Sequence, residues 1–94
     1  MQLVREVFAQ WKKIIGVTAQ DDTASTITDD LKGESVTVIC MSGNLWINPI
    51  TTAVADATAF KLVAGMTAPL NVESSLSLIS DATGATYQII VHKP

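Results

Sequence analysis

Hydrophobic residues at the start of the chain recur at intervals of three and four. The segment MQLVREVFAQWKKIIG carries them at Leu3, Val4, Val7, Phe8, Trp11, Ile14 and Ile15. This spacing aligns the side chains along one stripe of a helix, and Gly16 stands where a helix commonly ends. We therefore expect an N-terminal amphipathic helix over residues 1–16.

This expected helix has three possible roles. Its apolar stripe can pack on the core of its own domain, or it can anchor the chain to another subunit. Binding to a membrane surface is the weakest alternative, because only Arg5, Lys12 and Lys13 supply positive charge. The pattern alone does not separate the first two roles.

Residues 17–33 are small and polar, without a sustained apolar period. They include two pairs of neighbouring aspartates, which invites a calcium hypothesis. The Asp-x-Asp-x-Asp-Gly spacing of a calcium loop is absent, however. We interpret this segment as an acidic polar linker.

From residue 34 onward the apolar residues alternate with polar ones. The stretch ESVTVIC places Val36, Val38 and Cys40 on one side, and short runs follow in NLWI, FKLV, PLNV, SLSLIS and ATYQIIVH. About six or seven short strands, with turns every eight to twelve residues, are typical of all-β domains. Residues 34–94 are thus predicted to form a mainly β fold, a small antiparallel β-sandwich or barrel.

The polar stretch Asp81-Ala82-Thr83-Gly84 separates the last two apolar runs. Asp, Thr and Gly together could hold a metal or a phosphate, but chains use the same residues to reverse direction. Apolar residues alternate both before and after this stretch. We interpret it as a hairpin turn in which Gly84 supplies a positive φ.

Composition indicates a single domain that meets another chain. With 94 residues the chain is too short for two cores, and 48% of it is apolar while only 16% is charged. Cys40 is the only cysteine, so no internal disulfide can form, and association into a homo-oligomer is the remaining way to add stability.

Charge and hydropathy restrict the partners and the location. A net charge of −3 with six Lys and Arg disfavours nucleic-acid binding. No window approaches the roughly 18 apolar residues of a membrane-spanning helix, and the N-terminus lacks a secretory signal. We expect a chain that is made in the cytoplasm and binds neither nucleic acid nor membrane.

The sequence offers few residues that could perform catalysis or bind a metal or a cofactor. His92 is the only histidine, so one chain cannot assemble a catalytic triad or a multi-histidine metal site. Cys40 closes an alternating strand, where a buried hydrophobe is the more common role. No glycine-rich phosphate loop is present. The sequence predicts no catalytic, cofactor-binding or metal-binding residue, no cofactor, and no enzymatic activity.

Trp46 is the remaining candidate binding residue. In GNLWINP it alternates with Leu45 and Ile47, so it should point away from the core together with Asn44 and Asn48. An exposed tryptophan can anchor an interface or stack on a sugar or peptide. We favour the interface, which gives the candidate set Leu3, Val4, Val7, Phe8, Trp11, Ile14, Ile15 and Trp46.

The segments NLWINP, FKLVAG and LSLISDATGATYQIIV, within residues 36–91, resemble a module of small structural proteins of tailed bacteriophages and prophages. This resemblance implies a non-enzymatic, multi-copy virion protein, of the capsid decoration or head-associated type, located in the virion. Other virion subunits, such as a major capsid or a head or tail protein, would be its partners. The alternative is a glycan- or peptide-binding module that uses Trp46, Asn44 and Asn48, as in a phage tail or receptor-binding component.

Overall fold

The computed structural model describes residues 11–27 and 30–92 of the chain. It contains eight β-strands: β1 (Trp11–Gln20), β2 (Ser25–Thr26), β3 (Ser35–Ser42), β4 (Asn44–Asn48), β5 (Phe60–Val63), β6 (Thr67–Asn71), β7 (Ser77–Ser80) and β8 (Ala85–His92). The described residues include no helix, and none therefore that could cross a membrane. The expectation of a mainly β fold is confirmed.

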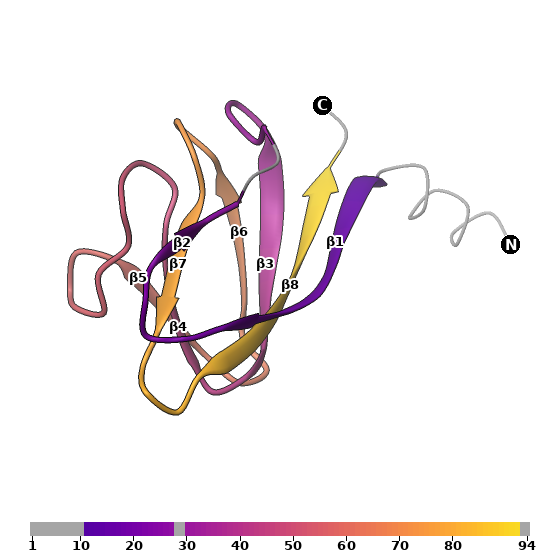
Figure 1. Ribbon diagram of the computed structural model, residues 1–94. Coiled ribbons are helices and arrows are strands. Elements are labelled where there is room, and N and C mark those ends of the chain that lie inside the picture. The colour runs from indigo at the N-terminus through magenta and orange to yellow at the C-terminus, as the bar shows by residue number, and fades with distance from the viewer. Residues whose placement is uncertain (1–10, 28–29, 93–94) are drawn as a thin grey trace, which may run out of the picture.

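The strands form two antiparallel four-stranded sheets that face each other (Figure 1). One sheet has the order β1-β8-β3-β6 and the other the order β2-β7-β4-β5. Of the connections between consecutive strands, only the one from β4 to β5 stays within a sheet. This alternation between two four-stranded sheets is the arrangement of a double-sheet jelly roll.

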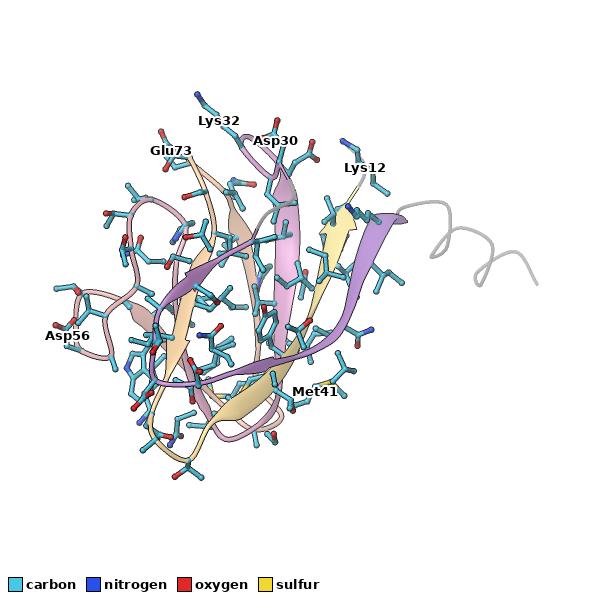
Figure 2. All side chains as sticks on the ribbon, in the orientation of Figure 1. Lys12, Asp30, Lys32, Met41, Asp56 and Glu73 are labelled. Carbon is cyan, nitrogen blue, oxygen red and sulfur yellow. The ribbon has the colours of Figure 1, made fainter. Side chains whose placement is uncertain are left out.

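The core lies between the sheets, because each long strand alternates apolar and polar residues. In β3 the side chains of Val36, Val38 and Cys40 are buried, and β8 contributes Tyr87, Ile89 and Val91. The opposite sheet supplies Leu45, Ile47, Leu62 and Leu78. The side-chain view shows this interior filled, with the labelled charged residues at its periphery (Figure 2).

The prediction of a helix through residue 16 is wrong for the described residues. Residues 11–16 belong to strand β1, which pairs with β8. Two register shifts interrupt this pairing, between Trp11 and Lys13 and between Ile15 and Thr18. Such bulges disrupt the alternation expected of a strand, so the apolar spacing looked helical. Leu3, Val4, Val7 and Phe8 lie outside the described residues.

The segment predicted as an acidic linker contributes to both sheets. Residues 17–20 complete β1, and Ser25–Thr26 form β2, which pairs with β7. Leu31 is buried in the core and Ile27 packs against it. The sandwich therefore begins before residue 34.

The turn at Asp81–Gly84 is confirmed, but it does not close a hairpin. Gly84 has φ 83° and its N–H donates to the carbonyl oxygen of Asp81 at 3.0 Å. The two strands that it joins, β7 and β8, lie in opposite sheets. The chain therefore arches across the sandwich here, and an alternating pattern cannot distinguish such an arch from a hairpin.

Candidate ligand-binding groove

Strands β5 and β6 are the outermost strands of their sheets on the same side of the sandwich. The turn that joins them is fixed to β3, because the N–H of Gly65 donates to the carbonyl oxygen of Cys40 at 2.8 Å and Cys40 donates to Met66 at 3.0 Å. Gly65 adopts φ 88°, which suits glycine. This turn sets where the two edge strands lie relative to each other.

An apolar groove of about 330 Å³ opens along this side. We call it the edge groove, and its lining residues are Pro49, Phe60, Thr67, Ala68, Pro69 and Leu70. The only side-chain polar group among them is the hydroxyl of Thr67. The volume falls at the lower end of the range of small-molecule sites, which are mostly apolar.

Phe60 forms one wall of the edge groove because of its register. It pairs with Ile47, whose side chain is fully buried, and cross-strand partners point to the same face. Phe60 therefore faces the gap between the sheets, yet 57% of its surface is exposed, whereas Leu62 in the same strand is fully buried. An inward-facing aromatic ring that remains exposed indicates an unfilled space.

Strand β6 forms the opposite wall. Ala68 and Leu70 pair with Val38 and Val36, which are buried, so they also face the gap between the sheets. Leu70 is half-buried and packs against the core. Pro69 lies between them and has no N–H to offer, so this edge is poorly suited to accept an added strand. The apolar side chains, rather than the edge backbone, are what the groove presents.

The loop from residue 49 to residue 59 is held in place beside the groove. The side-chain oxygen of Asn48 accepts hydrogen bonds from the N–H groups of Ile50 at 2.9 Å and Thr51 at 3.0 Å. The carbonyl oxygen of Pro49 accepts from the N–H of Glu73 at 3.0 Å. The wall formed by Pro49 is therefore preorganised.

Groups that could perform catalysis or bind a metal do not converge in the described part of the chain. No cluster of three His, Cys, Asp or Glu residues is present among residues 11–27 and 30–92. Burial raises the pKa of the Cys40 thiol, which disfavours the reactive thiolate. The hydrogen bond from Asn44 at 3.0 Å lowers the pKa of the Asp81 carboxyl and fixes it within the turn.

The structure places the predicted interface residues on different surfaces. Ile14 is exposed on β1, Ile15 packs against the core, and Trp11 begins the same strand. Trp46 lies on the far sheet, β2-β7-β4-β5, and Lys61 is positioned over its ring at 5.2 Å from the centroid. Ile14 and Trp46 are thus not parts of one surface, and their role as interface residues stays a prediction.

Trp46, Asn44 and Asn48 do not form a free sugar-binding set. Trp46 points away from the core, as its alternation with Leu45 and Ile47 predicts. The amide of Asn44 donates to Asp81, and Asn48 is buried and bonded to the loop that follows it. Both asparagines therefore serve the local structure.

Sequence reasoning missed the edge groove. The alternation in AFKLV does place Phe60 and Leu62 on one face, and this signal predicts that both point inward. It does not show that β5 and β6 are edge strands on the same side. That position arises from the order of strands in both sheets, which links residues far apart in the sequence.

Comparison with known proteins identifies the fold without a family. No family model matches the chain, and no curated protein matches it. The fold is similar to the Cupin_2 domain of an XRE family transcriptional regulator from Enterobacter cloacae, with 13% identity, a TM-score of 0.59, and coverage of 83% of this chain and 80% of that one. At such identity the likeness concerns the fold.

Two further solved structures have the same fold. A cupin-2 domain containing protein from Shewanella frigidimarina has 13% identity and a TM-score of 0.53, over 96% of this chain and 92% of that one. An HTH_3 family transcriptional regulator from Vibrio cholerae has 14% identity and a TM-score of 0.57. The match covers 84% of this chain but only 44% of that regulator.

These neighbours overturn the resemblance to phage structural proteins. The structures that share this fold include cupin-2 domains and transcriptional regulators, so the interpretations as a virion protein and as a phage tail module are wrong. The motifs behind them, such as NLWINP and FKLVAG, are short strands followed by turns. Short alternating strands and turn residues recur in unrelated β-sandwiches, which is why they misled the comparison.

Proposed function

We propose that this chain is a non-enzymatic binding domain that takes a small apolar molecule into the edge groove. The observation that carries the proposal is Phe60, an inward-facing aromatic residue that is 57% exposed at the mouth of an otherwise filled sandwich. Covering its ring and the neighbouring Leu70 with a ligand would remove apolar surface from water, which is favourable.

The chemistry of the groove supports binding rather than catalysis. None of its six lining residues is charged. The hydroxyl of Thr67 is the only side-chain group among them that could act as a nucleophile. Catalysis would require groups that transfer protons or stabilise charge near the ligand. Apolar walls with few polar groups are typical of sites that hold a ligand.

The solved structures with a similar fold suggest a biological role for ligand binding. The similar domains from Enterobacter cloacae and Vibrio cholerae are parts of transcriptional regulators. We propose on this ground that the chain is a sensing module, in which an occupied groove alters the contacts that the domain makes with a partner. Occupancy would stabilise the positions of β5, β6 and the loop that carries Pro49.

The experiment measures the binding of N-phenyl-1-naphthylamine, a neutral dye that fluoresces in apolar surroundings. Wild-type protein should bind it saturably, and Phe60→Ala should weaken binding about tenfold, the effect of losing roughly 1.4 kcal/mol of contact. Because Phe60 is largely exposed, its truncation should leave the fold intact.

Met41→Ala is the matched control. Met41 is 47% exposed, similar to Phe60, but it does not line the groove. This variant should bind the dye as the wild type does. Equal dye affinity in the wild type and in Phe60→Ala would contradict the proposed function, as would a Met41→Ala variant that loses binding to the same degree.

A further inference from the structure

A second hollow adjoins the edge groove along strand β6. It has a volume of about 340 Å³ and is lined by Ser35, Val36, Pro69, Leu70, Asn71 and His92. Pro69 and Leu70 line both hollows. We call the second one the polar hollow, because Ser35, Asn71 and His92 contribute a hydroxyl, an amide and an imidazole group, whereas the only polar side-chain group of the edge groove is the hydroxyl of Thr67.

The polar groups of this hollow are arranged by the sheet. Ser35 pairs with Asn71 across β3 and β6, and its hydroxyl donates to the side-chain oxygen of Asn71 at 2.6 Å. His92 lies at the end of β8 on the other side of β3, where its Nε2 is 2.8 Å from the hydroxyl oxygen of Thr37. These bonds hold the three side chains in place.

Hydrogen-bonding capacity remains after these contacts. The side-chain NH₂ of Asn71 can still donate, and the oxygen of Ser35 can still accept. The Nδ1 atom of His92 has no role in the bond to Thr37. The hollow can therefore both donate to and accept from one small head group.

Neither hollow is lined by Asp, Glu, Lys or Arg. Glu34, which precedes Ser35, is paired with Lys12 at 2.7 Å and faces another hollow. Placing a charged head group here would cost solvation without a compensating ion pair. An uncharged head group that both donates and accepts hydrogen bonds matches the lining.

We propose that the ligand is an uncharged amphiphile, with its apolar tail in the edge groove and a hydroxyl or amide head in the polar hollow. The molecule bends over Pro69 and Leu70, which both hollows share. This inference rests on the proposed function, since the tail occupies the same groove. It adds that Asn71 and His92 select the head group.

The test compares two ligands of equal size, 1-octanol and heptyl methyl ether, by displacement of the bound dye. Both have the same number of heavy atoms, but only the alcohol has an O–H group. The wild type should prefer 1-octanol roughly two- to tenfold, which corresponds to one net hydrogen bond. Asn71→Ala and His92→Ala should each reduce this ratio toward one.

Thr86→Ala is the control for a polar group on the same strand as His92. Thr86 lies toward the other end of β8, where it bonds to Ser42 at 2.7 Å, and it lines neither hollow. This variant should keep the preference for the alcohol. Thermal unfolding of each variant checks that the sandwich is intact, and His92→Gln serves if His92→Ala does not fold.

The outcomes separate this inference from the proposed function. If Phe60→Ala weakens both ligands while Asn71→Ala and His92→Ala keep the wild-type ratio, the head-group assignment is wrong and the groove stands. If Phe60→Ala leaves both affinities unchanged, the groove itself is not the site. A wild type that prefers the ether, or binds octanoate or octylamine more tightly than 1-octanol, also overturns the inference.

Discussion

The gap between the two sheets has two sides, and it is lined differently on each. On the side of β1 and β2, the chain crosses between the sheets at residues 21–24, and the buried Gln20 fills the corner. Its amide donates to the carbonyl oxygen of Thr23 at 2.8 Å and accepts from the hydroxyl of Ser25. On the side of β5 and β6, the gap between the sheets is lined by apolar side chains and by the exposed Thr67.

Apolar side chains show the consequence of this difference. Ile15 and Ile27, near the first side, are partly buried and pack against the core, as does Leu70 on the second side. On the second side Phe60 faces inward but stays more than half exposed. We infer that the β1–β2 side is built for stability, whereas the β5–β6 side leaves apolar surface for a ligand. Substitutions on the first side should therefore destabilise the fold more.

The largest effect is expected from a pair of glycine substitutions. Gly43 and Gly65 both have positive φ, 74° and 88°. A Cβ at Gly43 would lie only 2.1 Å from the carbonyl oxygen of Gly84, in the turn that packs toward Gln20, whereas a Cβ at Gly65 meets nothing within 4 Å. Gly43→Ala should reduce the free energy of unfolding by about 2–5 kcal/mol, from strain and steric overlap together.

Gly65→Ala is the matched control on the β5–β6 side. It introduces the same backbone strain without the overlap, so it should cost only about 1–2 kcal/mol. Urea unfolding measures both values. Equal losses for the two variants would show that the close approach of Gly43 and Gly84 does not contribute to stability.

A smaller loss of stability is expected when the hydrogen bonds of the Gln20 side chain are removed. Gln20→Ala removes the buried amide and leaves the hydroxyl of Ser25 and the carbonyl of Thr23 without these partners. Thr23 and Ser25 are exposed, so water can replace Gln20 as their partner, and the cost is that of two lost hydrogen bonds, about 1–3 kcal/mol together. The loss should appear in urea unfolding, while dye binding in the distant edge groove stays unchanged.

A larger loss of stability on the β5–β6 side than on the β1–β2 side would contradict the assignment of stability to the β1–β2 side. Thr67→Val changes the one hydroxyl of the edge groove and serves as the comparison on the β5–β6 side. It should leave the free energy of unfolding within about 0.5 kcal/mol of the wild type, as is usual for exposed positions. If Thr67→Val destabilises the fold more than Gln20→Ala, the β1–β2 side has no special role in stability.

Alternation predicted the strands of the β domain well. Strand β4 ends at Asn48, directly before Pro49, and β8 covers the whole of ATYQIIVH as expected. The inward residues Val36, Val38 and Cys40 were also correct. These features depend on neighbouring residues, so a local pattern contains the information needed.

Features that depend on distant residues were not predictable from the pattern. The turns near Gly43 and Gly84 join strands in opposite sheets, and alternation shows which face a residue occupies but not its partner strand. Strand β1 was not predicted, because its bulges disturb the two-residue alternation of apolar and polar side chains. The exposure of Phe60 follows from the edge position of β5, which only the assembled sheets define.

The smallest effect concerns the pH dependence of the β1–β2 side. Tyr87 of β8 is buried opposite Thr18 of β1, and burial raises its pKa above the ordinary value of 10.0, although a hydrogen bond with Thr18 opposes this shift. As the pH rises, the unfolded chain therefore releases the phenol proton before the folded chain does. The stabilisation is complete below about pH 10 and is lost as the pH rises above it.

Tyr87→Phe isolates this contribution, because it keeps the ring and removes the ionisable hydroxyl. The free energy of unfolding, measured from pH 8 to pH 11, should fall more steeply above pH 10 for the wild type than for the variant. Ionisation of Cys40, whose pKa is also raised by burial, affects both proteins and cancels in the difference. None of the residues that line the edge groove titrates in this range, so dye affinity should remain constant wherever the protein is folded. Parallel stability curves for the two proteins would show that Tyr87 does not couple the β1–β2 side to pH.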